Sequence, residues 1–289
     1  MFGGSSITES SRKLYTSNIK RLNNNEIPKS ATFLSKFDKI NEIIEKYSAN
    51  TKKSYYISIV SYLKDKKVSK KVKDYWNEKM LSANKKYLQT SDEKTQKQKD
   101  NWLSWDEVLD IHKKEKETLP KKVSNEKDYL KCLSYLVLSL YVLISPRRVK
   151  DYHEMLVVPE YKEGMSKEHN YLDVKNKKFV FNNYKTKGAY GQQVEEIPKE
   201  LFDILKKMII PKEKNFEPID MITTYEGVKP AGNYITRLLN SVFKKNVSAS
   251  LLRNIFVSHK LGNSKNEAKE LAQEMGSSVN VLQNVYNKD

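Results

Sequence analysis

Residues 248–289, SASLLRNIFVSHKLGNSKNEAKELAQEMGSSVNVLQNVYNKD, predict three helices in succession. The serine that opens the stretch can cap the first helix, which carries Arg253. Residues 264–267 (SKNE) form a capping box for the second helix, and Gly276 is a suitable stop for it. Tyr286 lies on the third, short helix. By themselves these residues are compatible with an ordinary polar surface, so their meaning depends on the chain upstream.

Length and charge set the broad class of the protein. The chain has 289 residues, enough for about two domains of ordinary size. Its net charge of +17 favours a polyanionic partner, which is DNA, RNA or an anionic membrane surface. Lysine supplies most of this charge, as expected from an AT-rich genome. The few arginines are therefore the more informative basic residues: Arg12, Arg21, Arg147, Arg148, Arg237 and Arg253.

Cysteine and histidine usage argues against a disulfide or a metal centre. The single cysteine, Cys132, lies in an apolar run, which suits a reducing compartment. The four histidines are scattered without the spacing of metal ligands, so no cofactor or metal is expected. The N-terminus lacks the basic head and apolar core of a signal peptide. The most apolar run, residues 129–144, contains Lys131 and predicts a buried helix rather than a membrane span.

Residues 7–90 predict a bundle of helices that is strongly basic. The clearest apolar stripe is Phe33, Phe37, Ile40 and Ile44 at helical spacing. Residues 1–100 hold 22 basic and 11 acidic side chains. The densest run is KDKKVSKKVK at 64–73, and the candidates for phosphate contact in it are Lys66, Lys67, Lys70 and Lys71. One such run alone would be read as a solvated helix face.

The rest of the chain predicts a polar linker at 89–101 and then a mixed domain. Residues 104–107 (SWDE) form a capping box, and residues 129–144 should lie at the centre of this domain. The fold class is therefore mainly α with a small antiparallel sheet, an α+β fold. The other predicted elements are a short helix beginning at 149 and running through 156, strands at 171–174, 178–182 and 193–197, and helices at 199–209 and 233–245.

The polar residues of this domain match the needs of phosphodiester cleavage without a metal. Such a site requires a nucleophile, donors for the two non-bridging oxygens and an acid for the leaving oxygen. Tyrosine can be the nucleophile, arginine is the best phosphate donor, and lysine can supply a proton. The chain offers Arg148, Lys185, Arg253 and Tyr286 in that order.

This ordered set resembles the tyrosine recombinase/integrase family, of which the phage integrases are members. The segment SPRRVKD at 145–151 resembles the first arginine box, in which an acidic residue, here Asp151, follows the catalytic Arg148 by three. Lys185-Thr186, between two predicted strands, resembles the lysine of the family's β-hairpin. The segment 250–253 (SLLR) resembles the His-x-x-Arg box, and the segment MGSS at 275–278 with the tyrosine that follows resembles the Leu-Gly-His-Ser…Tyr ending.

The resemblance implies a mechanism and a domain organisation. Tyr286 would attack the scissile phosphate and form a 3′-phosphotyrosyl intermediate, Arg148 and Arg253 would hold the non-bridging oxygens, and Lys185 would protonate the leaving oxygen. Residues 1–95 would be the basic, SAM-like core-binding domain, and residues 96–289 the catalytic tyrosine recombinase domain. The reaction would be site-specific DNA recombination or integration without metal or ATP.

Two residues depart from the family pattern, and more than one assignment stays open. Ser250 and Ser277 stand where the family usually has histidine, lysine or tryptophan, and are kept as supporting residues. Arg147 is an alternative to Arg148 as the catalytic arginine, although the spacing to Asp151 favours Arg148. The alternative functions are a type IB topoisomerase-like nicking and closing enzyme, a DNA-binding protein whose active site has decayed, and an RNA-binding or structural basic protein.

The resemblance also implies partners and a location. Duplex DNA is the expected partner, with self-association on DNA into a dimer or tetramer and no membrane contact. The protein is expected to be intracellular and with DNA, in a host nucleus, a cytoplasmic viral factory or a nucleoid. The lysine-rich composition fits a virus, a virophage or another mobile element.

Overall fold

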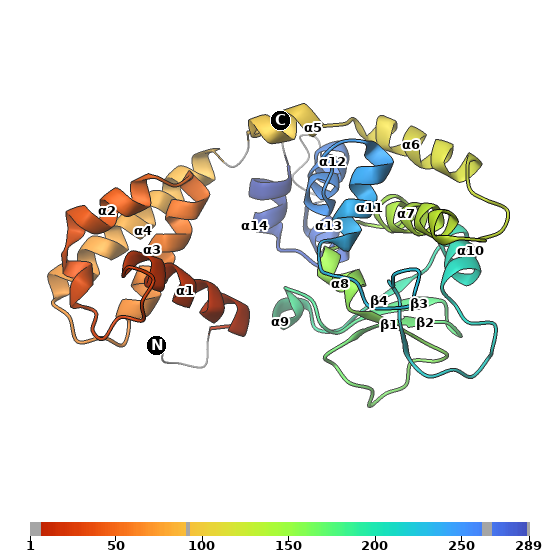
Figure 1. Cartoon of the computed structure of the whole chain (residues 1–289), viewed down its shortest axis with the longest axis horizontal. Coiled ribbons are helices and arrows are strands. Elements are labelled where there is room, and N and C mark those ends of the chain that lie inside the picture. Colours follow the sequence, from red (N-terminus) through yellow and green to blue (C-terminus); the bar gives the residue numbers. More distant parts are fainter. Residues whose placement is uncertain (1–6, 91–92, 262–267, 288–289) are drawn as a thin grey trace. The chain divides into compact units, whose positions relative to one another are not determined.

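The chain forms two compact units, Met1–Ser91 and Asp92–Asp289 (Figure 1). The computed structural model describes residues 7–90, 93–261 and 268–287. Each unit has its own hydrophobic core. Within the described ranges, no helix is both long and apolar enough to span a bilayer. The predicted capping box at 264–267 lies outside the described residues.

The first unit is helical, as its apolar periodicity predicts. Its core forms around Trp76, whose indole Nε1 donates a 2.9 Å hydrogen bond to the carbonyl oxygen of Leu34. Phe37 and Tyr75 stack on each other beside this indole. The elements are α1 (Glu9–Leu22), a 3₁₀ turn (Thr32–Ser35), α2 (Phe37–Glu45), α3 (Ala49–Leu63) and α4 (Lys70–Thr90).

The predicted linker at 89–101 is in large part helical, which corrects the prediction. Helix α4 continues to Thr90, and α5 (Gln96–Asn101) follows shortly after it. Thr95 and Gln98 form a capping box, in which the Thr95 hydroxyl accepts from the Gln98 amide and the Gln98 side chain accepts from the Thr95 amide. These local bonds stabilise a helix start without an apolar stripe, so periodicity alone did not indicate it.

The helices of the second unit surround α7 (Glu126–Val142), which is buried along most of its length. This confirms the predicted central helix. The capping box predicted at 104–107 is also present, at the start of α6. The other helices are α6 (Trp105–Glu117), α8 (Val149–His153), α9 (Lys187–Tyr190), α10 (Lys199–Met208), α11 (Tyr234–Phe243), α12 (Ala249–Leu261), α13 (Ala268–Glu274), α14 (Val279–Val281) and a π-helical turn (Leu282–Tyr286).

The small sheet has five strands in the order β4-β3-β2-β1-β5. Figure 1 labels β1 to β4. Strands β2, β3 and β4 correspond to the three predicted strands and are antiparallel. Strand β1 pairs in parallel with β2, so the sheet is mixed rather than antiparallel as predicted. The strands are β1 (Met155–Val158), β2 (Asn170–Asp173), β3 (Lys178–Phe181), β4 (Gln193–Glu196) and β5 (Ile219–Asp220).

Residues 155 and 156, the first two of strand β1, were predicted from the sequence to belong to a helix running from 149 through 156. Helix α8 ends at His153, and the short apolar run that follows becomes strand β1. Met155 and Val157 are fully buried, and the strand gains backbone partners on both sides from β2 and β5. Long-range pairing of this kind overrides local helical periodicity.

Candidate active site

The C-terminal end of α13 is a Schellman turn. The Ser277 amide donates to the Ala272 carbonyl oxygen at 2.8 Å, and the Gly276 amide donates to the Gln273 carbonyl oxygen at 3.0 Å. Gly276 has a φ of +55°, the left-handed conformation that glycine adopts without strain. The predicted helix stop at Gly276 is thus confirmed. The turn leaves the carbonyl oxygens of residues 274–276 without helical donors, so they accept from elsewhere.

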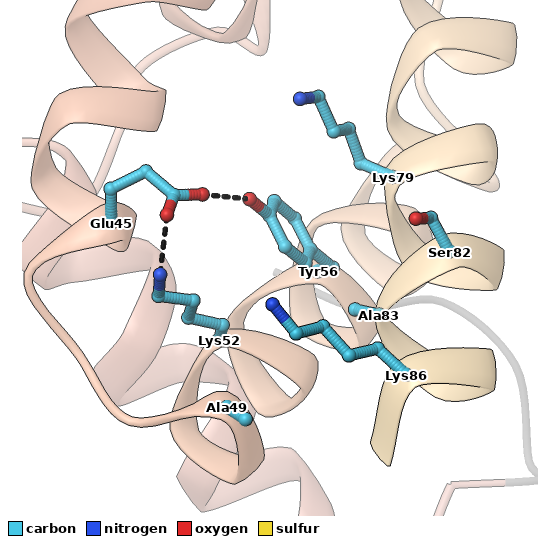
Figure 2. A pocket seen from close by; sticks show the side chains of 8 residues that line it. All are labelled: Glu45, Ala49, Lys52, Tyr56, Lys79, Ser82, Ala83 and Lys86. Atoms are coloured by element: carbon cyan, nitrogen blue, oxygen red, sulfur yellow. Dashed lines mark hydrogen bonds and ion pairs between the residues drawn. The ribbon is translucent and has the colours of Figure 1, made fainter. Parts of the chain in front are cut away.

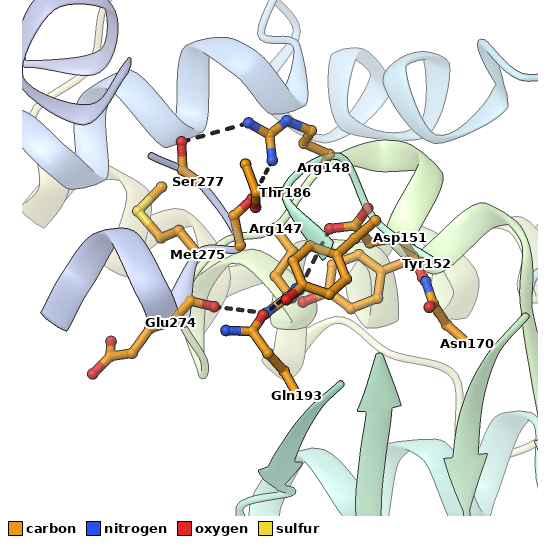
Figure 3. Close-up of polar contacts among 12 residues, drawn as sticks. Arg147, Arg148, Asp151, Tyr152, Asn170, Thr186, Gln193, Glu274, Met275 and Ser277 are labelled. Atoms are coloured by element: carbon orange, nitrogen blue, oxygen red, sulfur yellow. Dashed lines mark hydrogen bonds and ion pairs between the residues drawn. The ribbon is translucent and has the colours of Figure 1, made fainter. Parts of the chain in front are cut away.

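Three arginines donate to these three consecutive carbonyls. Arg147 Nη1 donates to the carbonyl oxygen of residue 274 at 2.8 Å, and Arg253 Nη2 to that of residue 275 at 3.3 Å. Arg148 Nη1 donates to the carbonyl oxygen of residue 276. The end of a helix carries partial negative charge, which favours cations at this place. The backbone of one helix end therefore gathers three guanidinium groups from two distant segments, and Figure 3 shows those of Arg147 and Arg148.

A buried carboxylate, Asp151, lies among the same three arginines. Its Oδ2 is 3.4 Å from Arg147 Nε, and both side chains are almost completely buried. Burial raises the pKa of Asp151, and the charges of Arg147, Arg148 and Arg253 oppose that rise. One negative charge and the carbonyl oxygens thus offset part of the repulsion among three cations. Asp151, a predicted supporting residue, is at the centre of the cluster.

The two adjacent arginines have different surroundings. Arg147 is 1% exposed, and its guanidinium also donates to Gln193 Oε1 at 2.9 Å and lies 3.7 Å from the centre of the Phe181 ring. Arg148 is half-buried, with Nη2 at 3.5 Å from Ser277 Oγ. Arg148 is therefore the one that retains solvent access for a ligand. The choice of Arg148 over Arg147 stays a prediction that this geometry favours.

Arg253 and Tyr286 lie side by side. Arg253 is 1% exposed, and burial lowers its pKa to about 10, so it still carries its charge at neutral pH. Its guanidinium carbon is 4.5 Å from the centre of the Tyr286 ring. Tyr286 ends the π-helical turn and is 9% exposed. Turns of this rare type occur frequently at functional sites.

Lys185 lies in the β3–β4 loop, as predicted, and its side chain is exposed. Both of its neighbours are held in place. Tyr184 Oη donates to the Gly191 carbonyl oxygen at 2.8 Å, which closes the loop on itself. Thr186 Oγ1 donates at 2.8 Å to the Gly276 carbonyl oxygen, which also accepts from an arginine of the cluster. The loop of Lys185 is thus fastened to the helix end that holds the arginines.

The two predicted serines are placed differently. Ser277 is fully buried beside Arg148 and belongs to the cluster. Ser250 is exposed on α12, three residues before the buried Arg253. In the described ranges no hydrogen bond joins the Ser250 side chain to the arginines. The structure therefore brings together five predicted residues and places the loop of a sixth against them, but it does not bring in Ser250. The five are Arg148, Asp151, Arg253, Ser277 and Tyr286.

Two residues of β4 that the sequence did not single out belong to the same region. Gln193 accepts from Arg147 and donates through Nε2 to the Gln273 carbonyl oxygen at 2.7 Å. Burial raises the pKa of Glu195 to about 7, which Arg147 opposes and Glu274 reinforces. Both residues lie on a short polar strand without distinctive spacing. The structure identifies them through the hydrogen bonds of the Gln193 carboxamide and through the burial of the Glu195 carboxylate near Arg147.

Replacing Glu195 with glutamine is expected to remove a pH dependence of stability. The folded-state pKa near 7 lies above the ordinary 4.5, so folding favours the protonated acid and stability falls as pH rises from about 5 to 8. Because Glu195 keeps some solvent contact, we expect a gain of about 1 kcal/mol at pH 8, or about 2–4 °C in Tm, and little change at pH 5. Thermal unfolding against pH measures this.

The matched control for that experiment is Glu196→Gln. Glu196 is the next residue on β4, and its side chain is 87% exposed near Lys178. Its substitution is expected to leave the pH dependence of Tm as in the wild type. Parallel pH curves for the Glu195 variant and the wild type would contradict the explanation.

The first unit presents two groups of lysines. One group lines a pocket of about 370 Å³ between α3, α4 and the end of α2, where Lys52, Lys79 and Lys86 surround Tyr56 (Figure 2). Glu45 accepts from Lys52 and from Tyr56 Oη, so it neutralises part of this charge. The other group is the predicted one, at the α3–α4 connection and the start of α4. In it Lys67, Lys70 and Lys71 are exposed, and Lys66 lies 5.3 Å from the centre of the Tyr62 ring.

The described part of the chain contains no group of three or more histidine, cysteine or acidic side chains arranged to hold a metal ion. No protein-family model and no curated protein matches the chain. Among solved structures, the chain is similar to the crystal structure of XerA recombinase. The two share 14% sequence identity, with a TM-score of 0.44, over 97% of this chain and 87% of that chain.

Proposed function

We propose that this protein cleaves and rejoins duplex DNA through Tyr286, in the manner of the tyrosine recombinases and integrases. The observation that carries the proposal is the arginine cluster at the end of α13, with Arg253 4.5 Å from the Tyr286 ring. A phosphate bound by Arg148 and Arg253 would lie next to the tyrosine. The order of these residues along the chain, which resembles that family, supports the same reaction.

In the proposed reaction the Tyr286 oxygen attacks phosphorus and its proton passes to solvent. A tyrosyl–phosphorus bond forms at the 3′ end, and the bond from phosphorus to the 5′ oxygen breaks. Lys185 gives a proton to that oxygen, which leaves as a 5′-hydroxyl. A 5′-hydroxyl of another strand then reverses the steps and frees the tyrosine. Because one phosphodiester replaces another, no external energy source is needed.

Arg148 and Arg253 would stabilise the charge that builds on the non-bridging oxygens. Their planar guanidinium groups match the phosphate geometry, and donors fixed before the reaction avoid the cost of reorganisation. Both are already fixed by carbonyl oxygens of the α13 end. The charge on Arg253 persists at neutral pH because its pKa, although lowered, is about 10.

Residues 1–95 would bind the DNA backbone. The lysines at the start of α4 and those that line the pocket in Figure 2 are positioned on one unit and could neutralise several phosphates. Binding that depends on such contacts weakens steeply with salt. Self-association on paired DNA sites, an intracellular location with DNA and an origin in a virus or mobile element belong to the same proposal.

The test is a search for a covalent protein–DNA adduct. The DNA is a pool of duplexes with randomised sequence and a nick, so that the short strand released on cleavage diffuses away and traps the intermediate. We expect an adduct that resists denaturant, with the DNA joined by its 3′ end to the peptide that contains Tyr286. No adduct from the whole pool, or attachment at another residue, would refute the proposal. Retained duplex binding without an adduct would identify a decayed enzyme.

The same pool distinguishes a recombinase from a topoisomerase and from an RNA-binding protein. A type IB topoisomerase-like enzyme would form adducts with little sequence preference, and as a monomer it would relax supercoiled plasmid. An RNA-binding or structural protein would show no preference for duplex DNA over RNA at matched salt. Recovery of a consensus sequence from the adducts is the result expected of a site-specific recombinase.

Replacing Arg148 with alanine is expected to slow adduct formation by about 10²- to 10³-fold, the effect of losing one preorganised donor to a developing oxyanion. DNA affinity should change little, because many phosphate contacts remain. Arg237→Ala is the control, since Arg237 is exposed on α11 and its guanidinium lies over the Tyr234 ring. Single-turnover cleavage rates measure both, and equal rates for the two variants would contradict the role of Arg148.

A further inference from the structure

Arg147 contacts both stems of the loop that carries Lys185. The loop spans residues 182–192, between β3 and β4. At the outgoing stem the Arg147 guanidinium carbon is 3.7 Å from the centre of the Phe181 ring. At the returning stem Arg147 Nη2 donates to Gln193 Oε1 at 2.9 Å. One buried side chain therefore contacts both ends of the loop, and Figure 3 shows its contact with Gln193.

The same arginine reaches the immediate neighbour of Lys185. The ring of Tyr184 is 5.0 Å from the Arg147 guanidinium carbon, and the Tyr184 hydroxyl donates to the Gly191 carbonyl oxygen at 2.8 Å. On the other side of Lys185, Thr186 donates to the Gly276 carbonyl oxygen. The lysine side chain is exposed, but the backbone on both sides of it is held.

The Arg147 side chain is itself held in place by buried contacts. It is 1% exposed, pairs with the buried Asp151 and donates to the carbonyl oxygen of Glu274 at 2.8 Å. Gln193 adds a second link, because its Nε2 donates to the Gln273 carbonyl oxygen. The β3–β4 hairpin is thus fastened to the α13 end through Arg147 and Gln193.

We infer that Arg147 is a positioning residue that holds the Lys185 loop where the lysine can protonate the leaving 5′ oxygen of DNA. The inference rests on the proposed function, in which Lys185 is the acid. A lysine has a long flexible side chain, so its effectiveness as an acid depends on how well its backbone is fixed. Arg147 does not touch the phosphate in this role. It acts through Phe181, Tyr184 and Gln193.

The test uses DNA in which sulfur replaces the bridging 5′ oxygen at the scissile phosphate. Its leaving group is a thiolate, which departs without protonation because thiols are far more acidic than alcohols. The duplexes carry the cleavage sequence recovered from the adduct pool. A variant that lacks the acid, or that positions it poorly, cleaves ordinary DNA slowly but cleaves the sulfur-substituted DNA at a rate close to that of the wild type. Loss of a phosphate donor slows cleavage of both substrates.

For Arg147→Met we expect cleavage of ordinary DNA to slow by about 10²-fold, at the lower end of the effect of a general acid. Sulfur-substituted DNA should restore the rate to within a few-fold of the wild-type rate on the same substrate. Lys185→Ala should give the same pattern with a larger initial loss. Arg148→Ala is the matched contrast, slow on both substrates because its role is at the phosphate.

Gln193→Met tests the inference without removing a buried charge. It breaks the link from Arg147 to the returning stem while keeping the size of the side chain, and it should show a smaller loss that sulfur rescues. Slow cleavage of both substrates by the Arg147 and Gln193 variants would overturn the inference, as would wild-type rates on ordinary DNA. If wild-type protein cleaves neither substrate, the proposed function fails. If sulfur fails to rescue Lys185→Ala, the role of Lys185 as the acid fails while DNA cleavage stands, and the inference about Arg147 fails with that role.

Discussion

Replacing Tyr286 with phenylalanine is expected to abolish the covalent protein–DNA adduct. The substitution removes only the hydroxyl oxygen that would form the bond to phosphorus. The aromatic ring keeps its place beside the Arg253 guanidinium, 4.5 Å from the ring centre, and keeps its packing in the core. We therefore expect cleavage to fall by more than about 10³-fold, as for other enzymes that lose a covalent nucleophile. Thermal stability and DNA affinity should stay close to those of the wild type.

The measurement is adduct yield from the randomised nicked pool after denaturation. Tyr225→Phe is the matched control, since Tyr225 is 47% exposed and its ring packs on Tyr129 rather than on an arginine of the cluster. It should form adducts at the wild-type rate. An adduct that persists in the Tyr286 variant would show that another residue is the nucleophile and would remove the basis of the proposed function.

Replacing Gly276 with alanine should damage both stability and cleavage. The φ of +55° is unfavourable for a residue with a side chain. A Cβ at this position would lie 2.4 Å from Arg147 Nη2 and 3.2 Å from Cδ2 of Tyr184. Arg147 could yield only by giving up its own contacts. We expect a loss of about 2–4 kcal/mol, which lowers Tm by about 5–10 °C.

The cleavage rate should also fall, because a backbone shift at residue 276 would displace the carbonyl oxygen that accepts from both Arg148 and Thr186. Single-turnover rates measured below the unfolding range separate the two effects. Gly188→Ala is the control, because Gly188 lies in the Lys185 loop and a Cβ there would meet nothing within 4 Å. A Gly276 variant that unfolds at the wild-type temperature, or that cleaves at the wild-type rate while folded, would contradict this account.

Local patterns in the sequence predict much of the fold. The apolar face of α7, the capping box at 104–107 and the glycine stop of α13 depend on neighbouring residues, and all three are present. The three strands predicted at 171–174, 178–182 and 193–197 are also confirmed. The predicted linker contains a helix because a local capping box starts one without an apolar stripe. The first residues of β1 were wrongly assigned to a helix because their pairing with β2 involves residues distant in sequence.

Part of the candidate site was predicted from the order of its residues along the chain rather than from local patterns. The order of Arg148, Arg253 and Tyr286 suggested a shared site, and the structure places these residues in one cluster. What holds the cluster together could not be read from residue types, since the arginines donate to main-chain carbonyls. The parts played by Arg147 and Gln193 likewise depend on contacts across the sheet and the α13 end.

The Schellman turn at the end of α13 has a consequence for how such a site can diverge. Every amino acid carries the same carbonyl oxygen, so the acceptors at residues 274 and 275 survive any substitution there that keeps the turn. Only the glycine is constrained by the shape of the backbone. Over evolutionary time, two of the three positions that hold the arginines can therefore drift in residue type while the arrangement persists. In a site built in this way, the backbone geometry can persist while the amino-acid sequence changes.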